Sequence, residues 1–319
     1  MLMIPLISNR TPIHAVAIIV LAVLALGFGT RDVLAQSIDN EILSKNGKLT
    51  SQQLEEVSEF VSEHADSLRT GDAEQVERAR LELFQPTRNP STTKSFMLEY
   101  STIVIDQLRP IVTGDDTLRA INAIQVISFL QTPDSFEKMI DLLDPAKNKN
   151  QTLRLAASGL VQRMAEDIQL NRGQVQFATR ELQQYSYSEG NWMIVLQEIE
   201  ALGNLSLNRK IESDSRASAL KAQIDTLGVV VDRIKNSEEA APLMNAVFRS
   251  LLVFRKNQLP ELGANRKLAV DRLAPILRKI NTIASDRMPS SDDGDLIASF
   301  EGAENVSSTL LSVIDNNRG

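Results

Sequence analysis

From residue 51 to the end of the chain, apolar residues recur with the 3.6-residue period of an α-helix. Thr50 begins a Thr-x-x-Gln capping box, and Leu54, Val57 and Val61 then fall on one helical face. No segment shows the alternation of apolar and polar residues that is typical of a β-strand. The pattern therefore predicts an all-α protein.

Breaks in the pattern divide the chain into four parts. Residues 36–90 predict an N-terminal helical hairpin, because an Asp-x-x-Gln helix start at Asp72 follows Gly71. Residues 91–206 predict repeated helix pairs, and residues 207–319 predict a further helical region with a polar loop at 286–295. Residues 1–35 predict a targeting segment rather than part of the fold.

A short internal repeat supports a stacked arrangement. Thr117-Leu118-Arg119 recurs as Thr152-Leu153-Arg154, 35 residues later, and each copy opens an amphipathic helix that follows another apolar helix. A weaker third copy places Val195, Ile199 and Leu202 forty-two residues after Leu153, Ala157 and Leu160. Periods of this length are typical of stacked helical repeats. The expected architecture is an α-solenoid or an irregular stack of antiparallel helix pairs.

Two repeat families have similar local patterns. The run from Leu153 to Ala157, Leu-Arg-Leu-Ala-Ala, followed by Leu160, resembles the second helix of HEAT-like repeats, and the resemblance covers residues 91–206 at most. Gly71-Asp72-Ala73 with Ala79 and Pro86 is similar to the second helix of a tetratricopeptide repeat. Either resemblance implies a concave surface for partners, and neither implies a reaction.

The first thirty-five residues predict export. Arg10 precedes an uncharged stretch from residue 11 to residue 30, and Val33 and Ala35 supply the small residues of a cleavage site before Gln36. We therefore expect a signal peptide and an extracytoplasmic location, in the periplasm or secreted. Residues 11–30 are also long enough to span a bilayer, so an uncleaved membrane anchor is the alternative.

Composition restricts the available chemistry. The chain has no cysteine, which excludes disulfides, zinc thiolate sites and cysteine nucleophiles. Of its two histidines only His64 follows the signal segment, and it lies at the edge of an apolar helical face beside Phe60 and Val61, which favours a structural role. Carboxylates are the remaining candidate catalysts. No cofactor or metal is expected, because the acidic run at 292–295 lacks the ligand spacing of a calcium loop.

Two groups of residues are candidates for partner binding. Tyr185, Tyr187 and Trp192 bring three of the fourteen aromatic residues together around a predicted turn. Residues 241–289 carry nine basic and three acidic side chains between acidic flanks. In this segment a basic ridge of Lys267, Arg272, Arg278 and Lys279 lies outside the predicted apolar stripe of one helix.

These features favour a non-catalytic helical scaffold that binds a protein or an anionic envelope component. Nucleic acid is not an expected partner, because the chain is exported and acidic, with a net charge of −7. Two alternatives stay open. One is a carboxylate-dependent hydrolase of the cell envelope, for which a strongly raised pKa of one glutamate in a concave pocket would be diagnostic. The other is a membrane-anchored helical spacer.

Overall fold

The computed structural model describes residues 37–287 and 292–316, and every regular element in them is helical. The all-α prediction is therefore confirmed for the described part of the chain. The predicted signal segment, residues 1–35, lies outside these residues, so cleavage and anchoring stay predictions. The α-helices are α1 (Asn40–Leu43), α2 (Ser51–Thr70), α3 (Ala73–Arg88), α4 (Lys94–Val112), α5 (Thr117–Phe129), α6 (Pro133–Asp141), α7 (Gln151–Met164), α8 (Arg172–Ser188), α9 (Trp192–Leu207), α10 (Ser213–Asn236), α11 (Met244–Val253), α12 (Arg266–Arg287) and α13 (Gly294–Asn316).

Short irregular helices interrupt the later part of this order. A 3₁₀-helix, η1 (Glu238–Leu243), precedes α11, and a π-turn, η2 (Phe254–Gln258), follows it. Two further 3₁₀ turns, η3 (Leu259–Glu261) and η4 (Gly263–Asn265), lead into α12. Pro242 and Pro260 lie in this stretch and disfavour a continuous α-helix.

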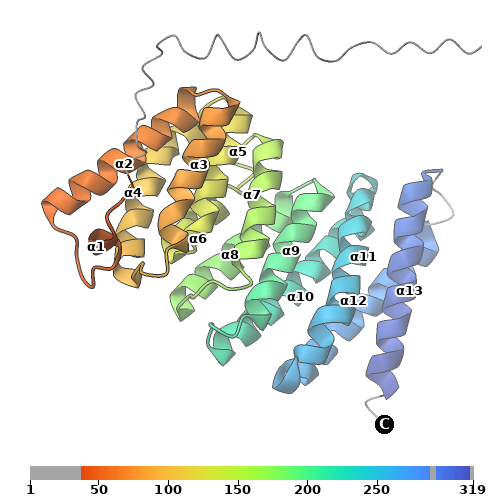
Figure 1. The fold of residues 1–319 in the computed structure, drawn as a ribbon. Helices are drawn as coiled ribbons and strands as arrows, with labels where there is room; N and C mark the ends of the chain where they lie inside the picture. Colours follow the sequence, from red (N-terminus) through yellow and green to blue (C-terminus); the bar gives the residue numbers. More distant parts are fainter. Residues whose placement is uncertain (1–36, 288–291, 317–319) are drawn as a thin grey trace, which may run out of the picture. The chain divides into compact units, whose positions relative to one another are not determined.

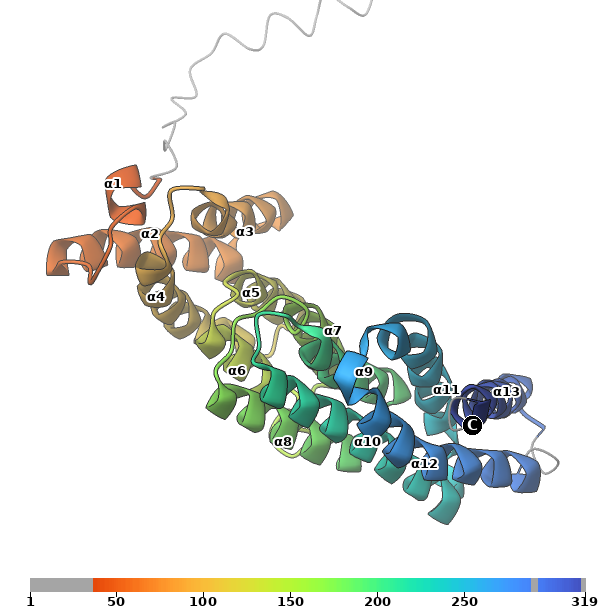
Figure 2. The ribbon, with the colours of Figure 1, turned by 90° about the horizontal axis from the view of Figure 1, so that it is seen from below.

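Helices α2 to α13 form six consecutive pairs in two rows (Figures 1 and 2). One row contains the even-numbered helices, and each of them contacts the next even-numbered helix. The odd-numbered helices from α3 onward form the second row in the same way. Each element therefore buries its apolar face against its neighbours in the stack, which is the organisation of a helical repeat protein.

The capping residues fix the register of the repeats. Thr93, Thr132 and Asn171 cap α4, α6 and α8 through their side chains, at intervals of 39 residues. Ser, Thr, Asp and Asn are the residues that satisfy free N–H groups at helix starts. The regular interval shows that three successive helix pairs begin at equivalent positions.

In the second row the repeat differs by one residue from the sequence prediction. Asp116, Asn150 and Asn191 cap α5, α7 and α9, at intervals of 34 and 41 residues rather than 35 and 42. The two Thr-Leu-Arg copies are consequently out of register: Leu118 is 73% exposed, whereas Leu153 is 4% exposed. The three letters match, but the buried positions of the two helices do not.

Arginines join successive pairs by binding the carboxyl ends of earlier helices. The Arg119 guanidinium donates hydrogen bonds to the carbonyls of Leu68 and Gly71 at the end of α2, at 2.9 and 3.1 Å. Arg287 on α12 likewise donates to the carbonyls of Lys235 and Ser237 at the end of α10. The last carbonyls of a helix lack intrahelical partners and carry partial negative charge, so a cation stabilises them.

Two helix boundaries lie where the sequence would favour a loop. Helix α3 continues through Pro86 to Arg88, and the Pro86 ring is buried, although proline disfavours the interior of a helix. Thr92 Oγ1 donates a hydrogen bond of 2.7 Å to the Pro86 carbonyl, and Arg88 lies 5.7 Å from the Phe84 ring centroid. Helix α12 continues to Arg287 and helix α13 begins at Gly294, so both helices extend into the polar loop predicted at 286–295.

Candidate functional site

The three predicted aromatic residues lie in different environments. Tyr185 on α8 is buried, and burial together with the Glu181 carboxylate raises its pKa. Tyr187, two residues later, is 45% exposed. Trp192, at the start of α9, is partly buried against the core, and the Arg249 guanidinium lies 5.2 Å from its ring centroid. Of the three aromatic residues, Tyr187 and the exposed part of Trp192, beside Arg249, are therefore accessible to a partner.

The predicted basic ridge divides into two paired and two exposed cations. Arg272 forms an ion pair with Asp225 of α10, and Lys279 forms one with Asp232, seven residues further along each helix. Helices α10 and α12 run parallel, so the two pairs are successive steps of one ladder. Lys267 and Arg278 are exposed, and neither has an ion-pair partner among residues 37–287 and 292–316.

A cluster of buried charged groups joins α7, α8 and α10. Arg154 on α7 is 7% exposed, and its Nε donates a 2.9 Å hydrogen bond to Oε2 of Glu189, which is 2% exposed. The other Glu189 oxygen accepts a 2.9 Å hydrogen bond from the Asn191 backbone N–H. Arg233 on α10 donates to the carbonyls of Ser186 and Glu189, at 2.6 and 2.8 Å. We call these residues, with Glu198, the charged joint.

Glu198 on α9 is the fully enclosed carboxyl of the charged joint. It is 1% exposed, and burial raises its pKa to about 8, against the smaller opposite effects of Ser186 and the two arginines. Its Oε1 is buried without a hydrogen-bond partner in the described part of the chain. A neutral carboxylic acid fits such a place better than a carboxylate, because an unpaired buried charge is costly.

The hydrogen bonds around Ser186 agree with a protonated Glu198. Ser186 Oγ lies 2.7 Å from Glu198 Oε2 and 2.8 Å from the Leu182 carbonyl. A hydroxyl has one hydrogen, and the carbonyl can only accept. Both contacts are satisfied when Glu198 donates to Ser186 and Ser186 donates to Leu182. Sequence reasoning missed this glutamate, although its place in an otherwise apolar face of α9 is a signal that the periodicity contains.

His64 has the structural environment that the sequence predicts. It is 7% exposed on α2, and its ring lies edge-on to Phe60 with 4.6 Å between centroids. Burial lowers its pKa, and its Nε2 has no hydrogen-bond partner among the described residues. These surroundings favour a neutral imidazole within the core.

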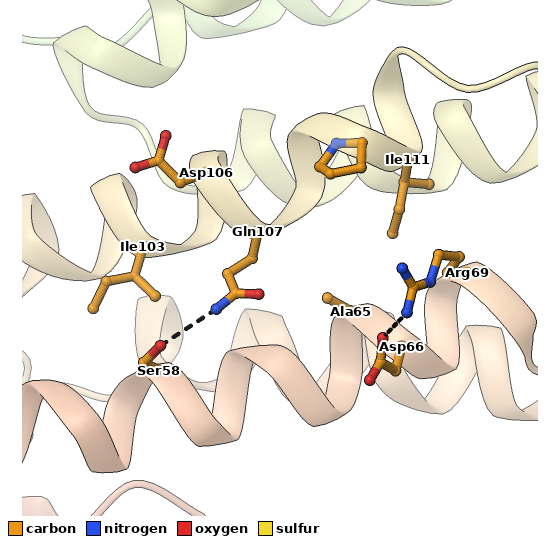
Figure 3. A pocket seen from close by; sticks show the side chains of 9 residues that line it. Ser58, Ala65, Asp66, Arg69, Ile103, Asp106, Gln107 and Ile111 are labelled. Atoms are coloured by element: carbon orange, nitrogen blue, oxygen red, sulfur yellow. Dashed lines mark hydrogen bonds and ion pairs between the residues drawn. The ribbon is translucent and has the colours of Figure 1, made fainter.

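A cavity of about 400 Å³ lies between α2 and α4 (Figure 3). Ala65, Ile103 and Ile111 give it an apolar floor, and Gln107 Nε2 donates a 3.3 Å hydrogen bond to Ser58 Oγ across it. Its charged lining consists of Asp66, Asp106 and Arg69, and each aspartate pairs with an arginine three residues later on its own helix. The charges at this cavity are thus already paired.

Within residues 37–287 and 292–316, no group of three or more His, Asp or Glu side chains is placed to hold a metal ion. No helix in the same residues is long and apolar enough to cross a membrane. Asp293 accepts hydrogen bonds from the backbone N–H groups of Asp295 and Leu296, and so caps α13. Residues 288–291 of the polar loop predicted at 286–295 lie outside the described residues.

Comparisons with known proteins do not identify a family. No protein-family model and no curated protein matches the chain. A de novo designed helical repeat protein is similar in structure, with 13% sequence identity, 88% of this chain and 99% of that chain covered, and a TM-score of 0.24. A designed self-assembling cyclic homooligomer is 12% identical, with 90% and 95% covered and a TM-score of 0.21. At these scores the repeat fold rests on the helix pairs of the chain itself.

Proposed function

We propose that the protein is an exported, non-catalytic scaffold of HEAT-like helix pairs that binds an acidic protein or an anionic envelope polymer. The observation that carries the proposal is the ordered stacking of six helix pairs, which leaves an uninterrupted series of helix faces on each row. Such stacks provide extended binding surfaces in helical repeat proteins. No reaction is needed for this role.

The exposed cations of α12 are the proposed contact. Lys267 and Arg278 are free to meet an anionic partner, whereas Arg272 and Lys279 are held by the aspartates of α10. Leu268, beside Lys267, is 36% exposed and would add apolar contact. Tyr187 and Trp192 supply a second contact of the aromatic kind that is common in interfaces.

Capture from envelope extracts tests this proposal. We expect the immobilised full-length protein to retain a partner that the double reversal Lys267→Glu/Arg278→Glu loses at least tenfold. The control Arg163→Glu/Lys221→Glu makes the same change of charge at two other exposed cations that have no ion-pair partner among residues 37–287 and 292–316, and should retain the partner. Equal recovery by all three proteins would contradict binding through α12.

The hydrolase alternative has one observation in its favour, the raised pKa of Glu198. A substrate has almost no access to this carboxyl, because Glu198 is 1% exposed and its Oε2 lies against the Ser186 hydroxyl. A hydrolytic role would require the charged joint to open. Loss of hydrolysis of envelope polymer in Glu198→Gln, with unchanged partner capture, would favour the enzyme over the scaffold.

The anchored-spacer alternative depends on residues outside the described part of the chain. Mass spectrometry of the protein from its own cells distinguishes the anchored spacer from the exported scaffold. A mature N-terminus at Gln36 supports the exported scaffold, and an intact N-terminal segment in the membrane fraction supports the spacer.

A further inference from the structure

A second cavity, of about 490 Å³, lies where α9 ends and α10 begins, beneath η3 and η4. Its lining includes the side-chain hydrogen-bond donors Arg209, Arg216, Ser213 and Asn265, whereas the Ser206 hydroxyl, also in the lining, donates to the Gly203 carbonyl. Glu261 is the only acidic side chain of the lining, so the cavity carries a net positive charge. This cavity is separate from the proposed contact on α12 and from the charged joint.

Arg216 is the unusual member of the lining. Its Nε is buried and has no hydrogen-bond partner among residues 37–287 and 292–316, and its guanidinium forms no ion pair with them. Arginine is almost always charged, and a buried guanidinium donor without a partner is costly. The guanidinium groups of Arg154 and Arg233, in contrast, are satisfied by a carboxylate or by backbone carbonyls. The Arg216 guanidinium therefore lines the cavity with donors that no acceptor of the described residues occupies.

Arg209 adds a second guanidinium that is weakly engaged. Its Nη2 lies 3.4 Å from Glu261 Oε2, beyond the usual range of a charged hydrogen bond, and both side chains are largely exposed. Little is lost when Arg209 turns toward another anion. Helix α10 also starts at this cavity, and its N-cap, Glu212, makes no side-chain cap. The free N–H groups of the first turn favour an anion in addition to the arginines, although Asp214 lies in the same turn.

A buried amide pair joins α10 to η2, between the cavity-lining residues Leu220 and Glu261 in the sequence. Gln223 Nε2 of α10 donates a 2.9 Å hydrogen bond to Oε1 of Gln258, which ends η2 and precedes η3. Gly203 of α9 leaves the room for this pair, since a Cβ there would lie 2.0 Å from Gln258 Nε2. Leu262 is buried in the next turn. The turn that leads into η3 is therefore tied to α10 by buried side chains.

We propose that this cavity binds a small soluble ligand through a phosphate group held by Arg216 and Arg209. A phosphate presents three terminal oxygens and close to two negative charges, which matches two guanidinium forks, the Ser213 hydroxyl and the α10 N–H groups. A single carboxylate would leave part of this donor set unused. The volume leaves space for an organic group beside Leu207 and Leu220.

Titration calorimetry of the full-length protein tests the site, with inorganic phosphate and phosphoserine as probes at constant ionic strength. We expect saturable binding that Arg216→Gln weakens at least tenfold and that Arg216→Lys, which keeps the charge but loses the fork, weakens less. Arg163→Gln, an exposed arginine of α7, is the control and should bind like the wild type. If Arg216→Gln fails to fold by circular dichroism, Arg209→Gln replaces it with a smaller expected loss.

Further arms separate the sources of phosphate and the possible failures. Binding to phosphatidic acid vesicles that exceeds binding to both soluble probes would overturn the soluble-ligand assignment in favour of a lipid headgroup. Equal heats with chloride, or equal affinity in wild type and Arg216→Gln, would overturn the site itself. Partner capture by Arg216→Gln should be normal, so failure here and failure of the scaffold proposal are distinguishable.

Discussion

Helices α5 and α7 bury an alanine at the position where α9 buries a glutamate. With the caps Asp116, Asn150 and Asn191 aligned, Ala123, Ala157 and Glu198 are equivalent, and all three are at most 1% exposed. The flanking buried positions remain apolar in α9, as Val195, Ile199 and Leu202 show. A single position has therefore changed from apolar to ionisable without disturbing the helix.

The buried polar contacts near these positions also change from neutral to charged along the stack. Between α4 and α6, the buried polar contact is a neutral pair of hydroxyls, Ser101 and Thr132, 2.6 Å apart. Between α7, α8 and α10 the contacts are those of the charged joint. The comparison teaches that the stack uses one packing scheme with two kinds of polar contact, and that only the second makes stability depend on protonation.

The largest expected effect comes from breaking the buried ion pair of the charged joint. Arg154→Leu leaves the Glu189 carboxylate buried without its partner, and we expect a loss of about 3 to 5 kcal/mol in the free energy of unfolding. Chemical denaturation measures it. Arg78→Leu, whose pair with Glu74 is on the surface, is the control and should change stability little. Equal losses in the two variants would contradict a special role for the joint.

The next effect concerns the neutral carboxyl itself. The folded-state pKa of Glu198 is raised to about 8 from 4.5, so the folded protein holds a proton that the unfolded chain releases above pH 4.5. The contribution of this proton to the free energy of unfolding is fully present below pH 4.5 and is lost as the pH rises toward 8. Glu198→Gln keeps the shape without the titrating proton, so at pH 8 we expect it to be more stable than the wild type by about 4 kcal/mol. A variant less stable than the wild type at pH 8 would show that the carboxylate is favoured.

Gly203 of α9 provides a smaller test of the same helix. Gly203→Ala places a methyl group against Gln258 and Gln223, and we expect a loss of about 1 to 3 kcal/mol from overpacking, because both amides must move. Gly190→Ala is the matched control, since nothing lies within 4 Å of a Cβ there. Thermal denaturation that gives the two variants equal midpoints would contradict the close packing of the amide pair.

The smallest effect belongs to the ladder between α10 and α12. Arg272→Gln removes one pair whose side chains are 40% and 37% exposed, and solvent screening limits the loss to less than about 1 kcal/mol. The loss should decrease when salt is added. Measuring stability at low and high salt checks this, and a loss that does not depend on salt would point to packing by the arginine stem instead.

Periodicity alone predicted the helices, because an apolar stripe at 3.6-residue spacing is a local property of the chain. The register of the repeats required more. The Thr-Leu-Arg match placed Leu118 opposite Leu153, whereas the caps Asp116 and Asn150 would have given the structural interval. N-capping residues are better markers of equivalent positions than short identical runs.

The candidate contacts were only partly predictable from the sequence, for a physical reason. The helical pattern shows that Arg272 and Lys279 lie outside the apolar stripe, but their partners Asp225 and Asp232 are 47 residues away. The equal seven-residue spacing of the two pairs could have indicated the ladder. Glu198 could have been found from its place among the apolar positions of α9. Arg216, which has no ion-pair partner among residues 37–287 and 292–316, could not be distinguished from a surface charge, because burial in a stack depends on which neighbour covers each face.

The most direct test of the contrast between α5, α7 and α9 is the titration of Glu198 by carbon-13 NMR. In protein labelled at the glutamate carboxyl carbon, the Glu198 resonance is the one that disappears in Glu198→Gln. We predict a titration midpoint near 8, as for a carboxyl that is buried and neutral. A midpoint near 4.5 would contradict the neutral carboxyl and, with it, the distinction between the charged joint and the rest of the stack.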